Sequence, residues 1–562
     1  MKLFRKFFNK NYLSFIIIFV LGAFLRFYKL NWGEGFFFHP DEYHIVASVN
    51  QLNFPSQMNP HFFSYGTFSI YLIYFTKIIF NLKSSAFLIG RFYSAFFSTL
   101  TILVVFLISK KIFDKTFYAC FSALLVVFSP GLIQQAHFAT PESILTFWFL
   151  ITLLFWFKWN EESKFKFLFF SAFTLGLGIG TKVVALTFLP ILMSLPITKL
   201  SLKKDILRFK LGKIIKRLTT TIILLAITFL TFLFIYPYSI LDFADFKHSL
   251  NYETDVGLGK QIVFYTRQFI NTRPFIFQFE KILPYTLGPL AIIFGIIGFI
   301  FIIYKLFKNF KKLNKPNNFN LLLLLLSFLA YLLPNVILFA KWTRFLAPIF
   351  PFFSIFSVYF IYYLETYLRK INKSKFVIQT LILTLTLTIL IWSYMVFSIY
   401  LKPDVRITAT KWINNNLPTG SFILTESGNM LEVPLFGSNR KLSFDFYHLD
   451  ENYLLKKQLS EFLAESDYFI VQSRRIFYNH QRLPIQFPVT SRFYDLLFSE
   501  QLGFNKIKEF DSFPTLRIAN YKLIINDEQG EETWSVFDHP VIRVYKKTKF
   551  LSVKDYAKLL KI

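Results

Sequence analysis

An Asp–Glu pair flanked by two histidines follows the first apolar run of the sequence, in Phe38-His39-Pro40-Asp41-Glu42-Tyr43-His44. A carboxylate beside an apolar segment is partly desolvated, which raises its affinity for a proton and suits it to act as a general base. A solvated loop with ordinary acids explains the same residues. The pair alone is therefore compatible with either interpretation.

A second acidic residue, Glu142, follows Thr140 and Pro141. Thr as N-cap, Pro at the first helical position and Glu in the first turn together predict the start of a helix. This structural explanation is sufficient for Glu142. The functional alternative is that Glu142 orients an acceptor or stabilises a cation near Asp41.

Cations recur close to these acids, and an Arg fork or a Lys point charge suits a phosphate group. The alternative for each is that the side chain reaches out to lipid headgroups. The candidates for binding a substrate or carrier phosphate are Arg91, Lys182, Lys341 and Arg344, with His39, His61 and His137 beside them.

The elements that position these residues must be membrane helices. The 562 residues are 54% apolar and 20% aromatic, but only 17% are charged, against about 25% in an average soluble protein. This composition excludes a soluble globular enzyme and a disordered chain, and the single cysteine, Cys120, excludes a disulfide scaffold. A polytopic membrane protein remains.

The net charge of +29 does not indicate a nucleic-acid partner, because Lys and Arg cluster in short segments between apolar runs. That distribution is typical of cytoplasmic loops. With Lys2–Lys10, Lys199–Arg217 and Arg369–Lys375 as examples of cytoplasmic segments, the N-terminus is expected inside and the C-terminus outside the cell membrane (plasma or inner). The topology has about eleven spans, at 12–28, 86–109, 117–134, 143–157, 167–180, 182–198, 218–236, 283–304, 320–340, 345–366 and 376–399.

Two long polar outer loops are expected, at 31–66 and 237–281. The run Thr67–Phe80 is apolar but short and contains Lys77, so we interpret it as an interfacial or re-entrant helix. Domain boundaries are expected at 1–400 for the transmembrane domain and 401–562 for a small extracytoplasmic α/β domain. In the latter, β-like runs at 422–425, 468–471 and 541–545 alternate with helix-like stretches at 409–415, 453–463 and 491–502.

Nucleotide-binding glycine loops in a strand–helix context and HExxH or CxxC metal motifs are all absent. A cytosolic nucleotide donor is therefore disfavoured. No cofactor or metal is required by the sequence, although a divalent cation is compatible with it.

Taken in order, the Asp41 motif, the Glu142 turn, the glycine-rich turn at Gly176, Gly178 and Gly180 before Lys182, and Arg344 with Pro348 resemble the GT-C glycosyltransferases. The likeness is to family 39, the protein O-mannosyltransferase and aminoarabinose transferase type that depends on a phospholipid carrier. Segments of the tail, such as Arg406–Ile413 and Glu531–Pro540, are similar too. The oligosaccharyltransferase signature WWDxG is missing.

This resemblance implies a polyprenyl-phosphate-linked sugar as donor, and a protein, lipid or glycan hydroxyl as acceptor. It implies an inverting transfer at the outer membrane face. Asp41 then matches the catalytic base and Glu42 its acidic neighbour. Glu142 stands where the family commonly has Asp, while Lys182 and Arg344 match cations that hold the carrier phosphate.

Two other functions fit the same residues. A transporter or flippase of lipid-linked sugars would use the same cations, although internal repeats typical of transporters are not visible. The second alternative is a non-catalytic assembly protein whose C-terminal domain binds partners. The enzyme hypothesis requires that acids of the first two outer connections converge with the cations in one lipid-accessible pocket.

Overall fold

The computed structural model describes residues 10–82, 84–198, 211–313, 315–370, 375–427, 431–437 and 439–562. The basic segments Lys2–Lys10, Lys199–Arg217 and Arg369–Lys375 therefore lie wholly or partly outside the described residues. The chain forms two compact units. Unit 1 comprises Met1–Leu30, Asp41–Gln261 and Thr272–Tyr394, and unit 2 comprises Asn31–Pro40, Ile262–Asn271 and Met395–Ile562.

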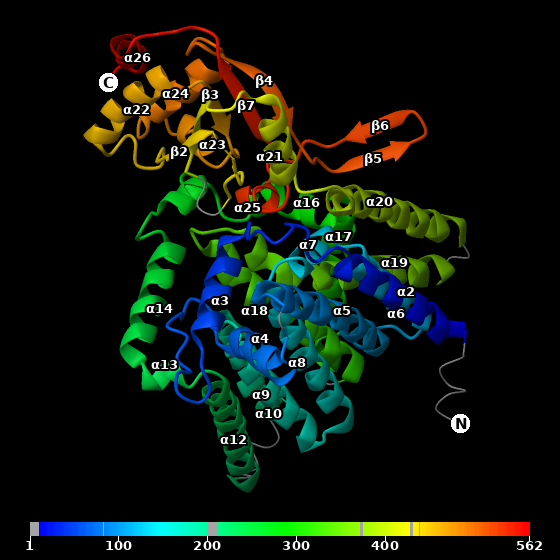
Figure 1. The fold of residues 1–562 in the computed structure, drawn as a ribbon. Coiled ribbons are helices and arrows are strands. Elements are labelled where there is room, and N and C mark those ends of the chain that lie inside the picture. The colour runs from blue at the N-terminus through cyan, green and yellow to red at the C-terminus, as the bar shows by residue number, and fades with distance from the viewer. Residues whose placement is uncertain are drawn as a thin grey trace. The chain divides into compact units, whose positions relative to one another are not determined.

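Unit 1 is helical (Figure 1). It contains α2 (Lys10–Phe27), α3 (Pro40–Gln51), α4 (Phe68–Ile79), α5 (Ala86–Ile112), α6 (Thr116–Val127), α7 (Pro130–Ala136), α8 (Glu142–Glu162), α9 (Phe165–Ile179), η1 (Val183–Phe188), α10 (Leu189–Thr198), α12 (Leu211–Ile235), α13 (Tyr238–Leu241), α14 (Phe243–Leu258), α15 (Ile276–Lys281), α16 (Leu283–Leu287), α17 (Pro289–Lys308), η3 (Phe310–Lys312), α18 (Pro316–Ile337), η4 (Thr343–Ile349), α19 (Phe350–Lys370) and most of α20 (Lys375–Leu401).

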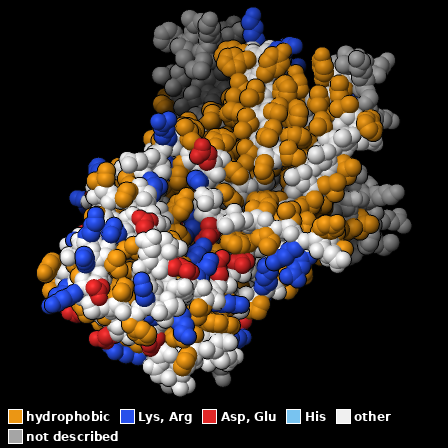
Figure 2. Space-filling model, turned by 90° about the horizontal axis from the view of Figure 1, so that it is seen from above, with side chains coloured by type: hydrophobic (Ala, Val, Ile, Leu, Met, Phe, Trp, Pro, Cys, Tyr) orange, Lys and Arg blue, Asp and Glu red, His pale blue; other side chains and the backbone are white. Residues whose placement is uncertain are grey.

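In the described part of the chain, seven helices are long and apolar enough to cross a membrane, and α6 with α7 adds an eighth if the pair is one span. Three further predicted spans, 12–28, 167–180 and 182–198, lie on shorter apolar helices, as does Thr67–Phe80. Exposed hydrophobic side chains gather over one part of the surface (Figure 2). Only 22% of the apolar stretch of α12 is buried, so its remaining side chains suit a lipid environment.

The structure adds detail to three local expectations. The predicted span 117–134 consists of two helices, α6 and α7, which meet at a bend of 58°. The span expected from residue 283 begins at Pro289, because Gly288 has a φ of +82° that interrupts the helix. The predicted loops 31–66 and 237–281 contain helices, among them α3 and α14.

A buried arginine supports the bend between α6 and α7. The guanidinium of Arg26 donates to the carbonyl oxygens of Val126 at 2.9 Å and Val127 at 3.3 Å, and to the hydroxyl of Ser98 at 2.8 Å. A bend deprives carbonyl groups of helical partners, and these cannot be left unpaired in an apolar environment. Arg26 supplies the missing donors and so fixes α7, which leads to Glu142.

Unit 2 is a sheet covered by helices on both faces. Its helices are η2 (Phe264–Phe269), the end of α20, α21 (Val405–Asn416), α22 (Tyr453–Glu465), α23 (Phe477–Gln481), α24 (Pro488–Phe498), α25 (Glu532–Ser535) and α26 (Val553–Leu560). Its strands are β1 (Phe422–Glu426), β2 (Arg440–Phe444), β3 (Tyr468–Val471), β4 (Phe504–Phe510), β5 (Thr515–Ile518), β6 (Tyr521–Ile524) and β7 (Ile542–Lys547).

The main sheet has the order β2-β1-β3-β7-β4, in which β1 is parallel to β2 and β3 while β7 is antiparallel to β3 and β4. Alternate side chains of β1 pack on opposite faces, as the two-residue period of a strand requires. Leu424 joins a core with α22, α24 and α26, and Ile423 joins a core with α21. The predicted class, a polytopic helical membrane protein with a small C-terminal sheet domain, is confirmed.

Candidate functional site

Asp41 and Arg344, which are 303 positions apart in the sequence, meet in unit 1. Asp41 lies in the first turn of α3, and one of its carboxylate oxygens is 3.5 Å from Nη2 of Arg344 at the start of η4. The hydroxyl of Tyr65 donates to the same oxygen at 2.8 Å. The predicted convergence of the first acidic motif with Arg344 is therefore confirmed. Asp41 remains 19% exposed and Arg344 14% exposed, so solvent or a ligand can reach both.

Tyr65 is the central residue that sequence reasoning missed. It is 7% exposed. Burial and the Asp41 carboxylate raise the pKa of Tyr65 well above its usual value, so its hydroxyl stays protonated and acts as a donor. Nothing in the sequence distinguishes Tyr65 from the many other aromatic residues of the chain, because its role depends on a partner 24 positions away.

The backbone around Tyr65 is tied to the glycine-rich turn. The amide groups of Gly66 and Phe68 donate to the carbonyl oxygens of Thr181 and Gly180, each at 3.0 Å. A Cβ at Gly66 would lie 2.0 Å from the Gly180 oxygen, so glycine is required there. This close approach brings Tyr65 beside Lys182, whose Nζ lies 5.1 Å from the tyrosine ring centre.

Lys182 pairs with Glu142, the second predicted acid. Its Nζ donates to Oε1 of Glu142 at 2.8 Å and also lies 4.7 Å from the ring centre of Phe345. Glu142 is 1% exposed, and its Oε2 has no hydrogen-bond partner among the described residues. A buried carboxylate oxygen without a donor is costly, so Glu142 keeps the capacity to accept one further hydrogen bond.

Glu142 lies in the first turn of α8, as expected, but Thr140 does not cap the helix. The residue before the helix is Pro141, and the Thr140 hydroxyl is buried without a hydrogen-bond partner among the described residues. The predicted capping role of Thr140 is therefore wrong. The helix instead begins one residue later than predicted, and its first turn is closed by the backbone bond from Leu145 to Pro141.

Glu42 and Arg91 face each other rather than the Asp41 site. Arg91 donates from Nε and Nη2 to the two carboxylate oxygens of Glu42 at 2.8 and 2.6 Å, and both side chains are fully buried. Glu42 also accepts from the backbone of Ala139, and Arg91 donates to the carbonyl of Leu30. The geometry thus does not support the direct roles predicted for Glu42 in catalysis and for Arg91 in carrier binding. The pair fixes α3 against α5, and with it the position of Asp41.

The other predicted residues lie in different environments. Lys341 is 3% exposed and donates to the Phe339 carbonyl at 2.8 Å and the Thr272 hydroxyl at 3.2 Å. Burial lowers its pKa to about 8. His137 is fully buried, with its ring nitrogens 2.8 and 2.9 Å from the carbonyls of Ile133 and Tyr28. These bonds indicate a structural role for His137.

His61 is exposed and lies next to Asp242, which immediately precedes α14, and to Asp245 in the first turn of that helix. Its Nδ1 is 3.7 Å from a carboxylate oxygen of Asp242 and 3.8 Å from one of Asp245. Ligand atoms of these three residues lie within 4.8 Å of one another, so the group could hold a cation. His39 belongs to unit 2, where it is buried against the ring of Phe537 at 4.1 Å.

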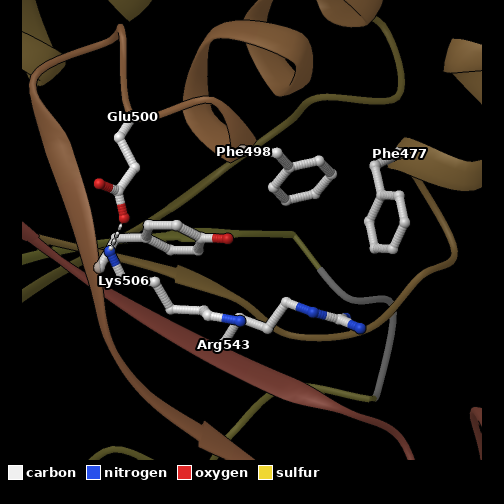
Figure 3. A pocket seen from close by; sticks show the side chains of 6 residues that line it. Phe477, Phe498, Glu500, Lys506 and Arg543 are labelled. Carbon is white, nitrogen blue, oxygen red and sulfur yellow. Dashed lines mark hydrogen bonds between the residues drawn. The ribbon is translucent and has the colours of Figure 1, made fainter.

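Unit 2 contains a cavity of about 330 Å³ lined by aromatic and charged side chains (Figure 3). Its lining residues are Phe477, Phe498, Glu500, Lys506, Arg543 and Tyr545. Arg543 pairs with Glu528 at 2.8 Å, and Lys506 pairs with Glu509 at 2.8 Å. Because these charges are balanced within the unit, the cavity favours no particular class of charged ligand.

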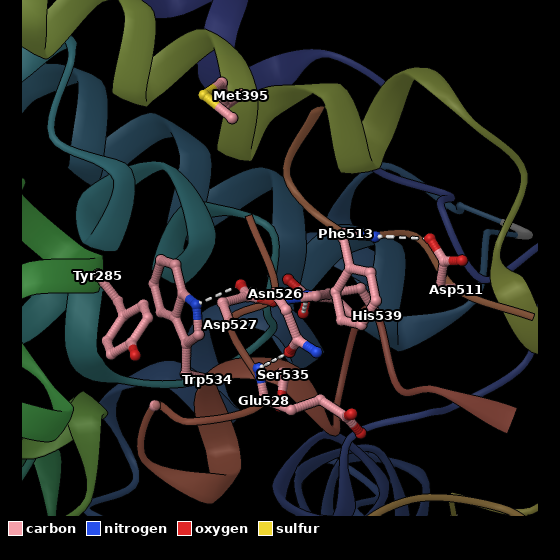
Figure 4. Close-up of polar contacts among 12 residues, drawn as sticks. Tyr285, Met395, Asp511, Phe513, Asn526, Asp527, Glu528, Trp534, Ser535 and His539 are labelled. Carbon is pink, nitrogen blue, oxygen red and sulfur yellow. Dashed lines mark hydrogen bonds and ion pairs between the residues drawn. The ribbon is translucent and has the colours of Figure 1, made fainter. Parts of the chain in front are cut away.

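A fully buried histidine lies elsewhere in unit 2. His539 contacts Asp538 through Nδ1 at 2.5 Å and Asp527 through Nε2 at 2.9 Å (Figure 4). Burial by itself lowers the pKa of an imidazole, but the two carboxylates outweigh it and raise the pKa of His539 to about 10. His539 is therefore a charged structural residue rather than a solvent-accessible base.

The raised pKa of His539 predicts that the free energy of unfolding decreases at alkaline pH. The folded state keeps the His539 proton up to about pH 10, whereas an unfolded histidine releases it near pH 6.5. The contribution of protonated His539 to the free energy of unfolding is thus complete below pH 6.5. It decreases by up to about 1.4 kcal/mol per pH unit as the pH rises towards 10. We expect thermal unfolding of the purified full chain to show this decline between pH 6.5 and 9.5.

The His539→Gln variant should be less stable at pH 6.5 and lose most of the slope. The matched control is His480→Gln, because burial and Arg267 lower the pKa of His480 to about 3, so it carries no proton in this range. An unchanged slope in His539→Gln would contradict the assignment.

Three comparisons bear on this arrangement. Residues 63–244, which supply Tyr65, Glu142 and Lys182, match the family model described as dolichyl-phosphate-mannose-protein mannosyltransferase. No curated protein matches the sequence of the chain.

Solved structures resemble the chain in fold. The oligosaccharyltransferase AglB of Archaeoglobus fulgidus, in complex with an inhibitory peptide and a dolichol-phosphate, has a TM-score of 0.52 at 14% identity, covering 87% of this chain and 72% of that one. The apo form of the Archaeoglobus fulgidus oligosaccharyltransferase has a TM-score of 0.52 at 15% identity, covering 88% of this chain and 73% of that one. ArnT from Cupriavidus metallidurans bound to undecaprenyl phosphate has a TM-score of 0.48 at 12% identity, covering 94% of this chain and 97% of that one.

At these identities the likeness to solved structures concerns the fold, while the family model concerns about a third of the chain. Together they confirm the resemblance that the sequence motifs predicted. The chain is a multi-pass membrane protein with the fold of the GT-C glycosyltransferases.

Proposed function

We propose that the chain transfers a sugar from a polyprenyl-phosphate carrier to an acceptor hydroxyl, with inversion at the anomeric carbon and with Asp41 as the general base. The observation that carries the proposal is the meeting of Asp41 with Tyr65 and Arg344, next to the Glu142–Lys182 pair. The family match supports a lipid-linked donor, because its description names a dolichyl-phosphate-linked sugar.

The reaction is a single displacement. The acceptor hydroxyl attacks the anomeric carbon from the face opposite the phosphate, and a new C–O bond forms as the bond to the phosphate oxygen breaks. Asp41 takes the hydroxyl proton, and the carrier leaves as its phosphate. The hydrogen bond from Tyr65 at 2.8 Å orients the Asp41 carboxylate for this step.

Arg344 and Lys182 stabilise the charge that develops on the departing phosphate. Fixed cations at the position where charge develops are among the most effective contributions a site can make. The guanidinium of Arg344 is held over the ring of Trp342 at 4.8 Å, and Lys182 lies between the rings of Tyr65 and Phe345. Arg344 pairs with Asp41 and Lys182 with Glu142, and the carrier phosphate would bind beside these acids. The proposed reaction requires no cofactor, and a divalent cation is compatible with it.

The site is assigned to the outer face of the cell membrane, with the N-terminus in the cytoplasm and the C-terminal sheet domain outside. The Lys- and Arg-rich segments between the spans favour this orientation. The carrier chain would lie among the spans while the acceptor, a protein, lipid or glycan, enters from the aqueous side.

The test is to incubate the purified chain in lipid nanodiscs with a radiolabelled polyprenyl-phosphate sugar and an acceptor extract. We expect labelled acceptor to form together with free carrier phosphate. A flippase, the alternative function, would move the labelled donor across the bilayer of a sealed vesicle without cleaving the bond. Movement without cleavage in that assay would therefore reject the transferase.

Replacing Lys182 by Met is expected to lower kcat/KM by about 10- to 100-fold, because a charge-assisted hydrogen bond to the phosphate contributes about 1.5–3 kcal/mol. Lys182→Arg should retain part of the activity. The matched control is Lys166→Met on α9, where the lysine is exposed, and it should leave the rate unchanged. Equal losses in both Met variants would show that the effect is not specific to the site.

A further inference from the structure

The second, two-stranded sheet of unit 2 is an amphipathic hairpin. β5 and β6 are antiparallel, with Leu516 opposite Leu523, Arg517 opposite Lys522, and Ile518 opposite Tyr521. Successive side chains of a strand point to opposite faces. One face therefore carries only apolar and aromatic side chains, from Leu516, Ile518, Tyr521 and Leu523. The other carries Arg517 and Lys522, with Thr515 and Ile524 nearer the base.

Much of the apolar face is open. Ile518 is 62% exposed, Tyr521 84% and Leu523 54%. A two-stranded ribbon alone is at best marginally stable in water, and clustered exposed apolar side chains indicate an interaction surface. This surface therefore requires an apolar partner.

The base of the hairpin is fixed to the end of a membrane span. The amide of Thr515 donates to the hydroxyl of Ser398 at 3.1 Å, and Ser398 lies in the last turn of α20. The candidate span of that helix runs from Phe376 to Leu401. Lys402, just after the span, donates to the Phe513 carbonyl at 3.4 Å.

The second strand of the hairpin is tied at the same base. The amide of Ile525 donates to the Pro514 carbonyl, and Asp527, two residues later, accepts from Trp534 at 2.8 Å and contacts His539 (Figure 4). Both strands of the hairpin are thus tied at its base, and the bond to Ser398 places that base at the end of the candidate span. Its place in the chain is the membrane–water boundary, where Tyr is enriched and long cations reach the headgroups.

We propose that the β5–β6 hairpin lies on the lipid bilayer, with Leu516, Ile518, Tyr521 and Leu523 inserted at the boundary between headgroups and acyl chains. Apolar faces of interfacial segments insert by about 5–10 Å. At that depth the opposite face lies at the level of the lipid phosphates. Arg517 and Lys522 bind these phosphates, because an anionic leaflet attracts basic side chains at its surface.

The single cysteine of the chain makes a direct test straightforward. In a Cys120→Ser background, a spin label is placed at Ile518→Cys or Leu523→Cys on the apolar face, and at Lys522→Cys as the matched position on the other face. The full chain is reconstituted in nanodiscs, and accessibility of each label to oxygen and to a water-soluble nickel chelate is measured. We expect the labels at 518 and 523 to be accessible to oxygen and protected from nickel, whereas the label at 522 is accessible to nickel.

Two results would overturn the proposal. Equal nickel accessibility at all three positions would place the hairpin in water. Protection of 518 and 523 from both reagents would show that protein, such as a second copy of the chain, covers the face.

The cationic face is tested by lipid composition. Nanodiscs containing anionic phospholipid should hold the label at 518 deeper than nanodiscs of zwitterionic lipid alone, and the Arg517→Gln/Lys522→Gln double variant should lose this difference. An unfolding temperature equal to that of the parent shows that the double variant is folded. A depth independent of lipid charge in the parent chain would reject the role of these two cations.

Discussion

Asp41→Asn is expected to reduce sugar transfer by about 10²–10⁴-fold, the usual contribution of a general base. Asparagine has almost the same shape, and its carbonyl oxygen can still accept the hydrogen bond from Tyr65. The substitution removes the charge that takes the acceptor proton while the surrounding geometry is kept. We therefore expect kcat to fall much more than KM changes.

Asp41→Asn is compared with the parent chain by measuring donor turnover of the purified proteins in nanodiscs. The unfolding temperature of each protein is measured as well. Glu253→Gln, an exposed acid on α14 in the same unit, is the matched control and should retain full activity. Asp41→Asn with normal stability and normal kcat would refute the role of Asp41. A rise in KM with unchanged kcat would assign Asp41 to binding rather than to proton transfer.

Breaking the buried pair between Glu42 and Arg91 is expected to cost about 3–5 kcal/mol in the free energy of unfolding. In Glu42→Gln the Arg91 guanidinium stays fully buried without its bidentate partner. The loss of activity should then follow the loss of folded protein. Thermal unfolding in detergent and the yield of monodisperse protein measure it.

A double variant separates the structural role from a chemical one. In Glu42→Leu/Arg91→Met both charges are removed together, and apolar replacement of a buried pair is often neutral. We expect the double variant to regain most of the free energy of unfolding that is lost in Glu42→Gln. The part contributed by the hydrogen bonds to Ala139 and Leu30 should not return, because both side chains that make these bonds are replaced. The control is Glu161→Gln, because the pair it breaks with Lys111 is partly exposed and should contribute less than about 1 kcal/mol.

If the folded double variant transferred sugar normally, neither residue would take part in the chemistry. A folded but inactive double variant would instead show that Glu42 or Arg91 takes part in the reaction. This outcome is informative because sequence reasoning placed both residues in the substrate site, while their burial indicates a positioning role.

Local patterns predicted several elements correctly. The β-like runs at 422–425, 468–471 and 541–545 correspond to β1, β3 and β7, because alternating or continuous apolar residues reflect burial in a sheet. The apolar runs 86–109 and 376–399 lie on α5 and α20 for the same kind of reason. Strands β2, β4, β5 and β6 were not predicted, since most of their side chains are exposed or only partly buried and leave little apolar signal.

The sequence by itself determined the membrane class, the GT-C resemblance and the acids and cations from which the site is drawn, because hydrophobicity, charge and residue type are local properties. Only the tertiary structure decided which of them meet. Asp41 faces Arg344 and Tyr65, while Glu42, one residue further along α3, is buried against Arg91. Adjacent residues of a helix point about 100° apart, and what each of them meets depends on segments tens to hundreds of positions away that packing brings together.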